Sequence, residues 1–415
     1  MTQTLRPLER VARLPPRLVL TGSNLISQGM MFVGGMIVAR ALGASGRGDL
    51  AIVAVYDDSS SRLLGAGMGV AVGESAARAG IHERHRVEAE LLGASVRFAF
   101  MMLPASLGVA VLVYGFALGD ASGPIRAMVL AAIVGTPLFN TVPNVGRMIL
   151  IARGQTRRVA ALLIIQGVSR LSLFAGLALT SQLTPIVAGA AFLGANWFTN
   201  ALTMGAVGVW PRSGRPLGPL LRYGIVTVPG ALATLTNSRL DQLLMVPLLS
   251  RADIGLYAVA VGVAFVPMNV GSTLGMSIFR EAANDDSPGR MATASRLRQG
   301  AKFVALSGAA SAVLAALLIV PVYGAEFRAA IVPAVVLLVG SSFTGMASML
   351  GQVGNALRHP GFSSVSSMCA LGVTIVGLPI FLPLLGILGA AIVSSVAYTV
   401  NCLVLFYLSK RASLF

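Results

Sequence analysis

The sequence has few charged residues, and few of those are acidic. Only 11% of its 415 residues are Asp, Glu, Lys or Arg, whereas a soluble domain averages about 25%. Because so little charge is present to cover a water-facing surface, the composition excludes an ordinary soluble domain. With 55% hydrophobic residues, the chain instead has the composition of a membrane protein.

Cysteine and histidine are almost absent, which excludes several kinds of site. Cys369 and Cys402 both lie in apolar segments, so a disulfide framework is not expected. No Ser-His-Asp arrangement can be assembled from the three histidines, His82, His85 and His359, and His82 and His85 lie in a charged loop that has no Cys. The glycine loop of nucleotide hydrolases, G-x-x-x-x-G-K-S/T, does not occur. We therefore expect no enzyme activity, no metal and no cofactor.

Hydrophobic runs long enough to cross a bilayer recur along the whole chain. A run of about 20 apolar residues has the length of a membrane-spanning helix. The runs predict an all-α integral membrane protein with about twelve spans, at residues 18–39, 49–73, 92–117, 127–151, 159–180, 185–209, 221–249, 255–279, 301–323, 330–356, 362–384 and 386–408.

Basic residues are distributed unevenly between the predicted loops. Of the 31 Lys and Arg, 21 fall in the N-terminal tail, in or within two residues of the even-numbered loops, and at the C-terminal end, and five fall in the odd-numbered loops. Because basic loops stay on the cytoplasmic side, both termini are predicted to be cytoplasmic. The same topology accounts for most of the +16 net charge. No aromatic–basic RNA signature accompanies it, so nucleic acid is not an expected partner.

Two segments of the sequence resemble each other at an offset of 207 residues. LGASGRGDLAIV begins at Leu42 and LSRADIGLYAVA begins at Leu249, so that Gly48 pairs with Gly255. Near the end of each half, PIVAGAA resembles GILGAAI. Because each half has six predicted spans, the repeat predicts two lobes related by a pseudo-two-fold axis along the membrane normal. We expect a basic cytoplasmic tail (1–17), an N-lobe of spans 1–6 (18–209) and a C-lobe of spans 7–12 (210–415).

The repeat segments also resemble a known family, the polysaccharide-transport flippases of the multidrug/oligosaccharidyl-lipid/polysaccharide exporter superfamily. ARALGASGRGDLAIV resembles their helix 1–2 junction, LIARGQTRRVAALLI their helix 4–5 junction, and NSRLDQLLMVPLLSRADIGLYAVAVGVAFVP their helix 7–8 junction. The resemblance extends from about Leu20 to Leu408. It departs from the family near Gly48, where Arg47 and Asp49 stand and the family often has an aromatic residue.

The resemblance implies a flippase that translocates undecaprenyl-diphosphate-linked oligosaccharide, a polysaccharide repeat unit, across the cytoplasmic membrane by alternating access. Its partners would be membrane lipids, the polyprenyl-diphosphate-linked glycan and other membrane proteins of polysaccharide assembly. Three alternatives stay open: a multidrug antiporter of the same superfamily, an integral-membrane glycan polymerase or ligase, and a lipid II flippase. A surplus of arginine in the spans disfavours the first, short loops disfavour the second, and twelve helices instead of the usual fourteen disfavour the third.

The second predicted span carries charges within an apolar run, VYDDSSSRLLGAGMGVAVG. Ionisable groups at bilayer depth are costly and usually face a cavity or a partner. Asp58 and Arg62 are four residues apart and would share one helix face, which continues through Gly65, Gly69 and Gly73. The stretch predicts either a structural ion pair beside a glycine packing stripe or a surface that lines a cavity.

Five arginines lie well inside the predicted spans: Arg62, Arg97, Arg147, Arg170 and Arg239. At about 1.5 Å per residue, Arg97 and Arg147 lie near the cytoplasmic surface and Arg170 near mid-bilayer. Arg62 and Arg239 lie in the outer half. Such a ladder suits a diphosphate, because arginine stays charged and binds phosphate oxygens bidentately. We predict substrate contacts for all five, above all for Arg62, Arg170 and Arg239. Snorkelling to the interface is the alternative for the two cytoplasmic ones.

Three aspartates also lie well inside the spans, at Asp57, Asp58 and Asp241. A membrane carboxylate can carry a coupling proton or cation, so these three are the candidates for ion or proton coupling. Arg239 is two residues from Asp241 and faces another side of a helix, so no local ion pair is expected there. Five arginines against three aspartates leave a balance of +2 in the spans, which favours an anionic cargo over a cationic drug.

Overall fold

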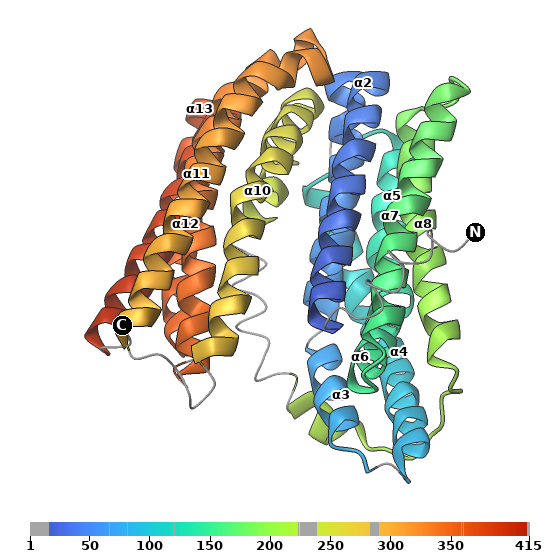
Figure 1. Cartoon of the computed structure of the whole chain (residues 1–415). Coiled ribbons are helices and arrows are strands. Elements are labelled where there is room, and N and C mark those ends of the chain that lie inside the picture. The colour runs from blue at the N-terminus through green and yellow to red at the C-terminus, as the bar shows by residue number, and fades with distance from the viewer. Residues whose placement is uncertain are drawn as a thin grey trace, which may run out of the picture. The chain divides into compact units, whose positions relative to one another are not determined.

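A computed structural model describes residues 16–65, 67–80, 82–118, 121–222, 224, 239–282, 290–357, 359 and 361–412. Within these ranges the chain is helical and contains no β-strand. Eight of the helical stretches are long and apolar enough to cross a membrane. The helices, drawn in Figure 1, are α2 (Pro16–Leu64), α3 (Met68–Ala77), α4 (Arg84–Phe116), α5 (Gly123–Thr136), η1 (Pro137–Thr141), α6 (Val142–Ala152), α7 (Thr156–Leu179), α8 (Pro185–Val207), α10 (Arg251–Ala282), α11 (Arg290–Tyr323), η2 (Ala325–Ala330), α12 (Ile331–Ala356) and α13 (Gly361–Arg411).

Two of these helices each contain two predicted spans joined at a glycine. α2 bends at Gly43, which has a φ of 70°, and α13 bends at Gly386, which has a φ of 56°. Glycine adopts a positive φ readily because it has no Cβ, so each glycine lets the chain turn without a separate loop. Spans 1 and 2 therefore meet at Gly43, and spans 11 and 12 meet at Gly386.

The second predicted span is broken, which corrects the expectation of one continuous face of charges and glycines. α2 ends at Leu64 and α3 begins at Met68, and Gly67 between them has a φ of 68°. The face that carries Asp58 and Arg62 therefore ends with α2, and it does not continue through the glycines of α3.

The glycines of α3 nevertheless allow another helix to approach. A methyl group on Gly69 would lie 2.8 Å from Nδ2 of Asn144, and one on Gly73 would lie 3.4 Å from Cβ of Met148. Both contacts are on α6. The predicted packing role is therefore present, but between α3 and α6 and separate from the charged turn of α2.

The fourth predicted span contains a π-helical turn. α5 runs into η1 and then into α6 without a break. Pro143, in the first turn of α6, has no N–H to donate to the carbonyl of Phe139, four residues earlier. That carbonyl instead accepts a hydrogen bond from Nδ2 of Asn200 at 2.7 Å. Turns of this kind are frequent at functional sites, and this one lies beside the site described below.

The sixth and seventh predicted spans are described to different extents. α8 corresponds to the sixth span and begins with a capped end, in which Oγ1 of Thr184 accepts the N–H of Val187 and Pro185 occupies the first turn. Most of the seventh span lies outside the described residues. From Arg239 to Met245 the chain is helical.

The helices group into two compact units. Unit 1 comprises Met1–Val38 and Tyr56–Ala231, and unit 2 comprises Ala39–Val55 and Leu232–Phe415. The middle of α2, residues 39–55, thus packs with the C-terminal helices although it belongs to the N-terminal half of the sequence. The lobe boundaries expected from the repeat, 18–209 and 210–415, stay a prediction.

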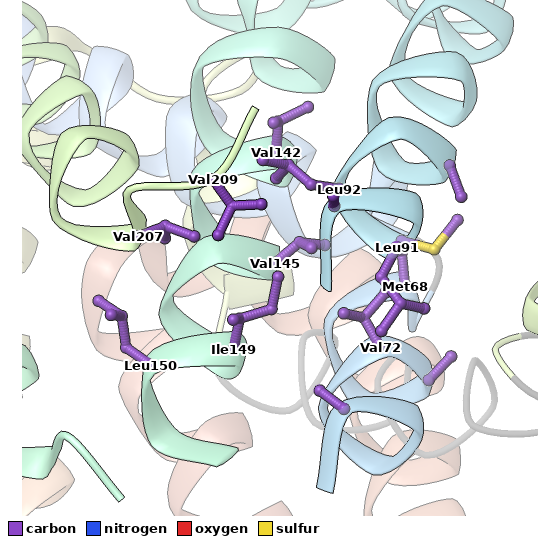
Figure 2. Packing of buried hydrophobic residues seen from close by; sticks show 14 of the residues in the cluster. Met68, Val72, Leu91, Leu92, Val142, Val145, Ile149, Leu150, Val207 and Val209 are labelled. Atoms are coloured by element: carbon purple, nitrogen blue, oxygen red, sulfur yellow. The ribbon is translucent and has the colours of Figure 1, made fainter. Parts of the chain in front are cut away.

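Unit 1 has a core built where four helices meet. Aliphatic side chains from α3, α4, α6 and the end of α8 interlock there, as Figure 2 shows. Close packing of such side chains supplies the dispersion contacts that stabilise helices in a membrane. The labelled members are Met68, Val72, Leu91, Leu92, Val142, Val145, Ile149, Leu150, Val207 and Val209.

Unit 2 relies on close backbone contact between α10 and α12. A methyl group on Gly345 would lie 2.6 Å from the carbonyl oxygen of Pro267, and one on Gly275 would lie 3.1 Å from Cα of Met349. Small residues permit this approach of two membrane helices. α11 and α13 also pack against α12 (Figure 1).

Large hydrophobic side chains cover outward faces of the helices. A water-soluble protein rarely exposes so much contiguous apolar surface, and lipid is the solvent that such faces match. The chain is therefore a multi-pass membrane protein. Examples on α4 and α11 are Leu107, Val111, Phe116, Phe303, Leu306 and Leu317.

Candidate functional site

Asp57, on α2, is a buried carboxylate held by two amides. The residue is only 7% exposed. Its Oδ1 accepts from Nδ2 of Asn140 at 2.9 Å, and its Oδ2 accepts from Nδ2 of Asn196 at 3.0 Å. An ionised carboxylate can only accept hydrogen bonds, and a buried charge must be compensated. The two amides, from η1 and α8, provide that compensation, so the site is arranged for a negative charge at Asp57.

A second layer of polar side chains orients these amides. Oδ1 of Asn196 accepts from Nη2 of Arg170 and from Nε2 of Gln166, the latter at 3.0 Å. Oδ1 of Asn140 accepts from Nδ2 of Asn200 at 3.1 Å. Donors therefore point toward the carboxylate along both arms. We call this set, Asp57 with the three asparagines, Gln166 and Arg170, the unit 1 polar network.

Arg170, on α7, is the buried cation of this network. It is 8% exposed, and its guanidinium carbon lies 4.5 Å from the centroid of the Phe192 ring, a cation–π distance. Nη1 donates to the sulfur of Met31 at 3.2 Å. Nε is buried and has no hydrogen-bond partner among the described residues. The arrangement retains a positive charge in the unit and leaves one N–H for an anion to accept.

Unit 2 has its own buried carboxylate, Asp241. Its Oδ2 accepts from the hydroxyls of Tyr257 at 2.5 Å and Ser394 at 3.1 Å, and its Oδ1 accepts from the backbone N–H of Gln242 at 2.7 Å. Arg239 donates to Oε1 of Gln242 at 3.1 Å, in line with its expected direction away from Asp241. Each unit thus compensates one aspartate with hydrogen-bond donors of its own.

Asp58 and Arg62 form the ion pair that their spacing predicts. Nε of Arg62 lies 3.1 Å from Oδ1 of Asp58, and the two side chains are 45% and 31% exposed. Arg62 lies in the last turn of α2, where a positive charge is favourable to the helix dipole. This geometry fits the structural alternative, and the exposed guanidinium still leaves room for a ligand contact.

The two arginines predicted near the cytoplasmic surface differ from each other. Nη2 of Arg97 donates to the backbone carbonyl of Arg215 at 2.5 Å, so it fixes the segment that follows α8. Nε of Arg147 is buried and has no hydrogen-bond partner in the described part of the chain. Arg147 therefore has a donor available, whereas Arg97 has a structural contact.

The sequence analysis missed the asparagines of the unit 1 polar network. It searched the spans for ionisable residues, and Asn140, Asn196 and Asn200 carry no charge. A signal was present, because an amide within an apolar run such as TPLFNTVPN or FLGANWFTN must find a partner at bilayer depth. The three amides connect Asp57 and Arg170, which the sequence had presented as separate candidates.

A buried ion pair at the end of α4 was also missed. Arg153 donates to Glu88 from Nη2 to Oε2 at 2.6 Å and from Nε to both Oε1 and Oε2 at 3.0 Å, and its Nη1 donates to the carbonyl of Val207 at 2.7 Å. Glu88 is 2% exposed. The pair ties together the ends of α4, α6 and α8.

The middle of α2 makes a set of polar contacts within unit 2. Nη1 of Arg40 donates to the carbonyls of Pro321 at 2.7 Å and Val322 at 3.1 Å. Asp49 lies 3.6 Å from Nε of Arg251. We call residues 39–55 the docking segment.

For metals, the described residues contain no group of three or more His, Cys, Asp or Glu placed to hold an ion.

No protein-family model matches the chain, and no curated protein matches it in sequence. Solved structures match nearly its whole length. The lipid II flippase MurJ, in an inward closed conformation, matches with a TM-score of 0.74 at 13% identity, over 96% of this chain and 89% of that one. A multidrug resistance MATE family transporter of the MOP superfamily, in an inward-facing conformation, has a TM-score of 0.69 at 15% identity, over 95% and 98%. The MATE multidrug transporter DinF-BH, in complex with R6G, has a TM-score of 0.63 at 15% identity, over 95% of each chain.

These matches establish the fold of the chain as that of the MOP superfamily transporters. They confirm the predicted fold class, an all-α membrane protein with about twelve spans in two lobes, and the predicted resemblance to that superfamily. The proteins that share the fold are transporters and flippases. A fold can carry many substrates, so the cargo has to be argued from the residues.

Proposed function

We propose that the chain is a flippase that translocates undecaprenyl-diphosphate-linked oligosaccharide across the cytoplasmic membrane. It does so by alternating access between an N-lobe and a C-lobe, with both termini in the cytoplasm. The fold supports a transporter of this superfamily, and one protein with the same fold is named a lipid II flippase. The bias of Lys and Arg toward the even-numbered loops supports the orientation.

The observation that carries the proposal is the buried guanidinium of Arg170, which has an N–H without an acceptor in the described part of the chain. The groups that contact its guanidinium, Asn196, Met31 and Phe192, are neutral, the carboxylate of Asp57 lies one amide away, and Nε of Arg170 has no acceptor among the described residues. A buried unpaired donor is costly, more so on a charged group. A diphosphate would supply the missing acceptor for this N–H, and a cationic drug would not.

The arginines and aspartates of the spans take different roles in this proposal. Arg62, Arg170 and Arg239 contact the head group, and Arg97 and Arg147 meet it closer to the cytoplasm. Of the coupling candidates Asp57, Asp58 and Asp241, we favour Asp57. It is joined to Arg170 through a single amide, so a change of its charge is felt at the anion site. Asp58 has an exposed ion-pair partner instead.

The proposal is tested by deleting the gene and extracting the membrane lipids. We expect undecaprenyl-diphosphate-linked oligosaccharide to accumulate, and the wild-type gene to relieve the accumulation. The variant Arg170→Ala should not relieve it. Arg158→Ala is the matched control, because Arg158 is exposed and its guanidinium bonds to Gln155, three residues earlier on the same helix end. Relief by Arg170→Ala at normal expression would contradict the role of this residue.

A multidrug antiporter is the second candidate. The buried carboxylates Asp57 and Asp241 favour it, because a carboxylate in each unit could bind a proton or a cationic drug, and two of the matched structures are multidrug transporters. It predicts normal lipid-linked glycan and new sensitivity to cationic drugs after deletion. A glycan polymerase or ligase has no support from the solved structures that share this fold.

A further inference from the structure

The two amides that hold Asp57 are not held equally themselves. Asn196 accepts from two donors, Nη2 of Arg170 and Nε2 of Gln166. Asn140 accepts only from Asn200 among the described contacts. That one donor also has a second acceptor, since Nδ2 of Asn200 bonds to the Phe139 carbonyl. Rotating Asn196 would therefore deprive the Arg170 guanidinium and the Gln166 amide of their acceptor. Rotating Asn140 would affect only its contact with Asn200, and the Asn200 amide would keep the Phe139 carbonyl as an acceptor.

This asymmetry matters because the two amides offer Asp57 hydrogen-bond donors and no acceptor. Both amides present N–H groups to the carboxylate. A proton taken up from water would turn one carboxyl oxygen into an O–H donor, and a buried O–H without an acceptor is costly. An amide that turns its oxygen toward Asp57 supplies that acceptor. A neutral hydrogen bond is weaker than one from a guanidinium, so Asn140 is the amide that turns.

The charged groups around Asp57 do not alter this choice. Its own helix presents Asp58, which is paired with Arg62. α7 presents Arg170, which is bonded to Asn196. The other two elements that contact Asp57, η1 and α8, present only the neutral amides. No charged group described here holds Asn140 in its present orientation.

Asn140 lies in the π-helical turn, Pro137–Thr141, and its rotation would act on that turn. Asn200 donates both to the Asn140 side chain and to the Phe139 carbonyl, the carbonyl that Pro143 cannot serve. When the Asn140 amide turns, its NH₂ group faces the NH₂ group of Asn200. Two donors cannot form a hydrogen bond, so the contact between the two side chains is disturbed. Departures from α-helical bonding are the points at which helices bend.

We propose that Asn140 is the positioning residue that transmits the charge state of Asp57. On protonation of Asp57 the Asn140 amide rotates and the turn Pro137–Thr141 shifts, while Asn196 stays bonded to Arg170. The inference rests on the proposed function in one respect only, namely that Asp57 changes its charge during transport. Its chemistry requires a proton from water and no other reactant.

The chain contains a reporter beside the turn. The ring of Phe139 stacks on Trp197 of α8 with a centroid distance of 4.8 Å and an interplanar angle of 24°. The other of the two tryptophans, Trp210, is 87% exposed. Replacing it by Trp210→Phe leaves Trp197 as the sole tryptophan. A shift of the π-helical turn would change this stack and with it the fluorescence of Trp197.

The test is a pH titration of Trp197 fluorescence in the full-length Trp210→Phe protein, held in lipid nanodiscs, from about pH 8 to about pH 3, a range that includes the usual carboxyl pKa value of about 3.9. We expect one sigmoidal transition. Asp57→Asn and Asn140→Ala should each give a flat trace, and Gln166→Ala should keep the transition because Arg170 still holds Asn196. A flat trace for the parent protein, or a transition that survives Asp57→Asn or Asn140→Ala, would overturn the proposal. So would loss of the transition in Gln166→Ala.

A second variant keeps the test valid should Asn140→Ala fail to fold. Asn200→Ala removes the donor that opposes rotation of Asn140, so the protonated state becomes easier to reach. The midpoint should rise by about half to one pH unit, the equivalent of one hydrogen bond. A midpoint that is unchanged or lower would contradict the proposal. Because fluorescence needs no cargo, this result is independent of whether the protein flips a lipid-linked glycan.

Discussion

Gly48 and Gly255 touch each other through their backbones. A methyl group on Gly48 would lie 3.2 Å from the nitrogen of Gly255 and would overlap the carbonyl of Arg251. A methyl group on Gly255 would lie 2.9 Å from the nitrogen of Gly48 and would overlap the carbonyl of Ala44. These two glycines are the pair that the internal repeat aligns. The repeat motif is therefore also the contact by which the docking segment packs on the start of α10.

Substitution of either glycine should disturb this contact. Gly48→Ala or Gly255→Ala forces a methyl group into backbone atoms that cannot rotate away, and overpacking of this kind costs about 1–3 kcal/mol. Thermal unfolding in detergent should show a lower midpoint for both variants. Gly176→Ala is the control, because the space around Gly176 in α7 is open and alanine is the better helix former. An unchanged midpoint for Gly48→Ala would contradict the tight contact.

Linking the docking segment covalently to α10 should stop transport. Asp49 and Arg251 form an ion pair at 3.6 Å, so cysteines at these positions lie within reach of a short bifunctional thiol reagent after Cys369 and Cys402 have been replaced by alanine. If the segment must leave α10 during alternating access, linking Asp49→Cys/Arg251→Cys with a reagent that contains a cleavable bond should abolish transport, and cleavage of the reagent should restore it. The single-cysteine variants are the controls. Normal transport by fully cross-linked protein would show that the segment stays docked throughout the cycle.

Removal of the buried acid Glu88 should destabilise unit 1. Glu88→Gln leaves the Arg153 guanidinium without its counter-charge in a buried position, and breaking such a pair costs about 3–5 kcal/mol. The matched control is Arg86→Gln, which removes an ion pair at 3.0 Å whose arginine is 79% exposed. It should lower the free energy of unfolding by less than about 1 kcal/mol. Both are measured by the unfolding midpoint. Equal effects of the two substitutions would contradict the assigned role of the Glu88–Arg153 pair.

The two hydroxyl donors to Asp241, Tyr257 and Ser394, should contribute non-additively to the free energy of unfolding. Tyr257→Phe removes a hydrogen bond to a buried carboxylate and should cost about 1.5–3 kcal/mol. Ser394→Ala removes a second donor to the same oxygen. Because the two share Oδ2, the double variant should differ from the sum of the single ones by more than about 0.5 kcal/mol. Strict additivity of the two unfolding free energies would show that they act independently.

The spans could be predicted from the sequence because each is a long apolar run, and a bilayer demands helices of that length. The sequence did not show that spans 1 and 2 join through a kink at Gly43, because the positive φ of this residue depends on local geometry that composition does not report. The break at Gly67 was missed for the same reason. The hydropathy of GAGMGVAVG continues that of α2, although the backbone does not.

The candidate site was predicted in part. The ion pair of Asp58 and Arg62 follows from their spacing alone. The link between Asp57 and Arg170 does not, because it passes through Asn196, 26 residues from Arg170 in sequence. Only the packing of α7 on α8 brings the two together. Neutral amides in apolar runs carry no charge signal, yet they decide which buried charges communicate.

The most direct test of the account is translocation by the purified protein in liposomes. Undecaprenyl-diphosphate-linked oligosaccharide is placed in both leaflets, and the rate at which inner-leaflet glycan becomes accessible to a membrane-impermeant oxidant is measured. We predict rapid translocation by the wild-type protein and a rate lower by about tenfold or more for Arg170→Ala, with Arg158→Ala unchanged. A wild-type rate equal to that of protein-free liposomes, together with proton-driven uptake of a cationic dye, would contradict the account and identify the protein as a drug antiporter.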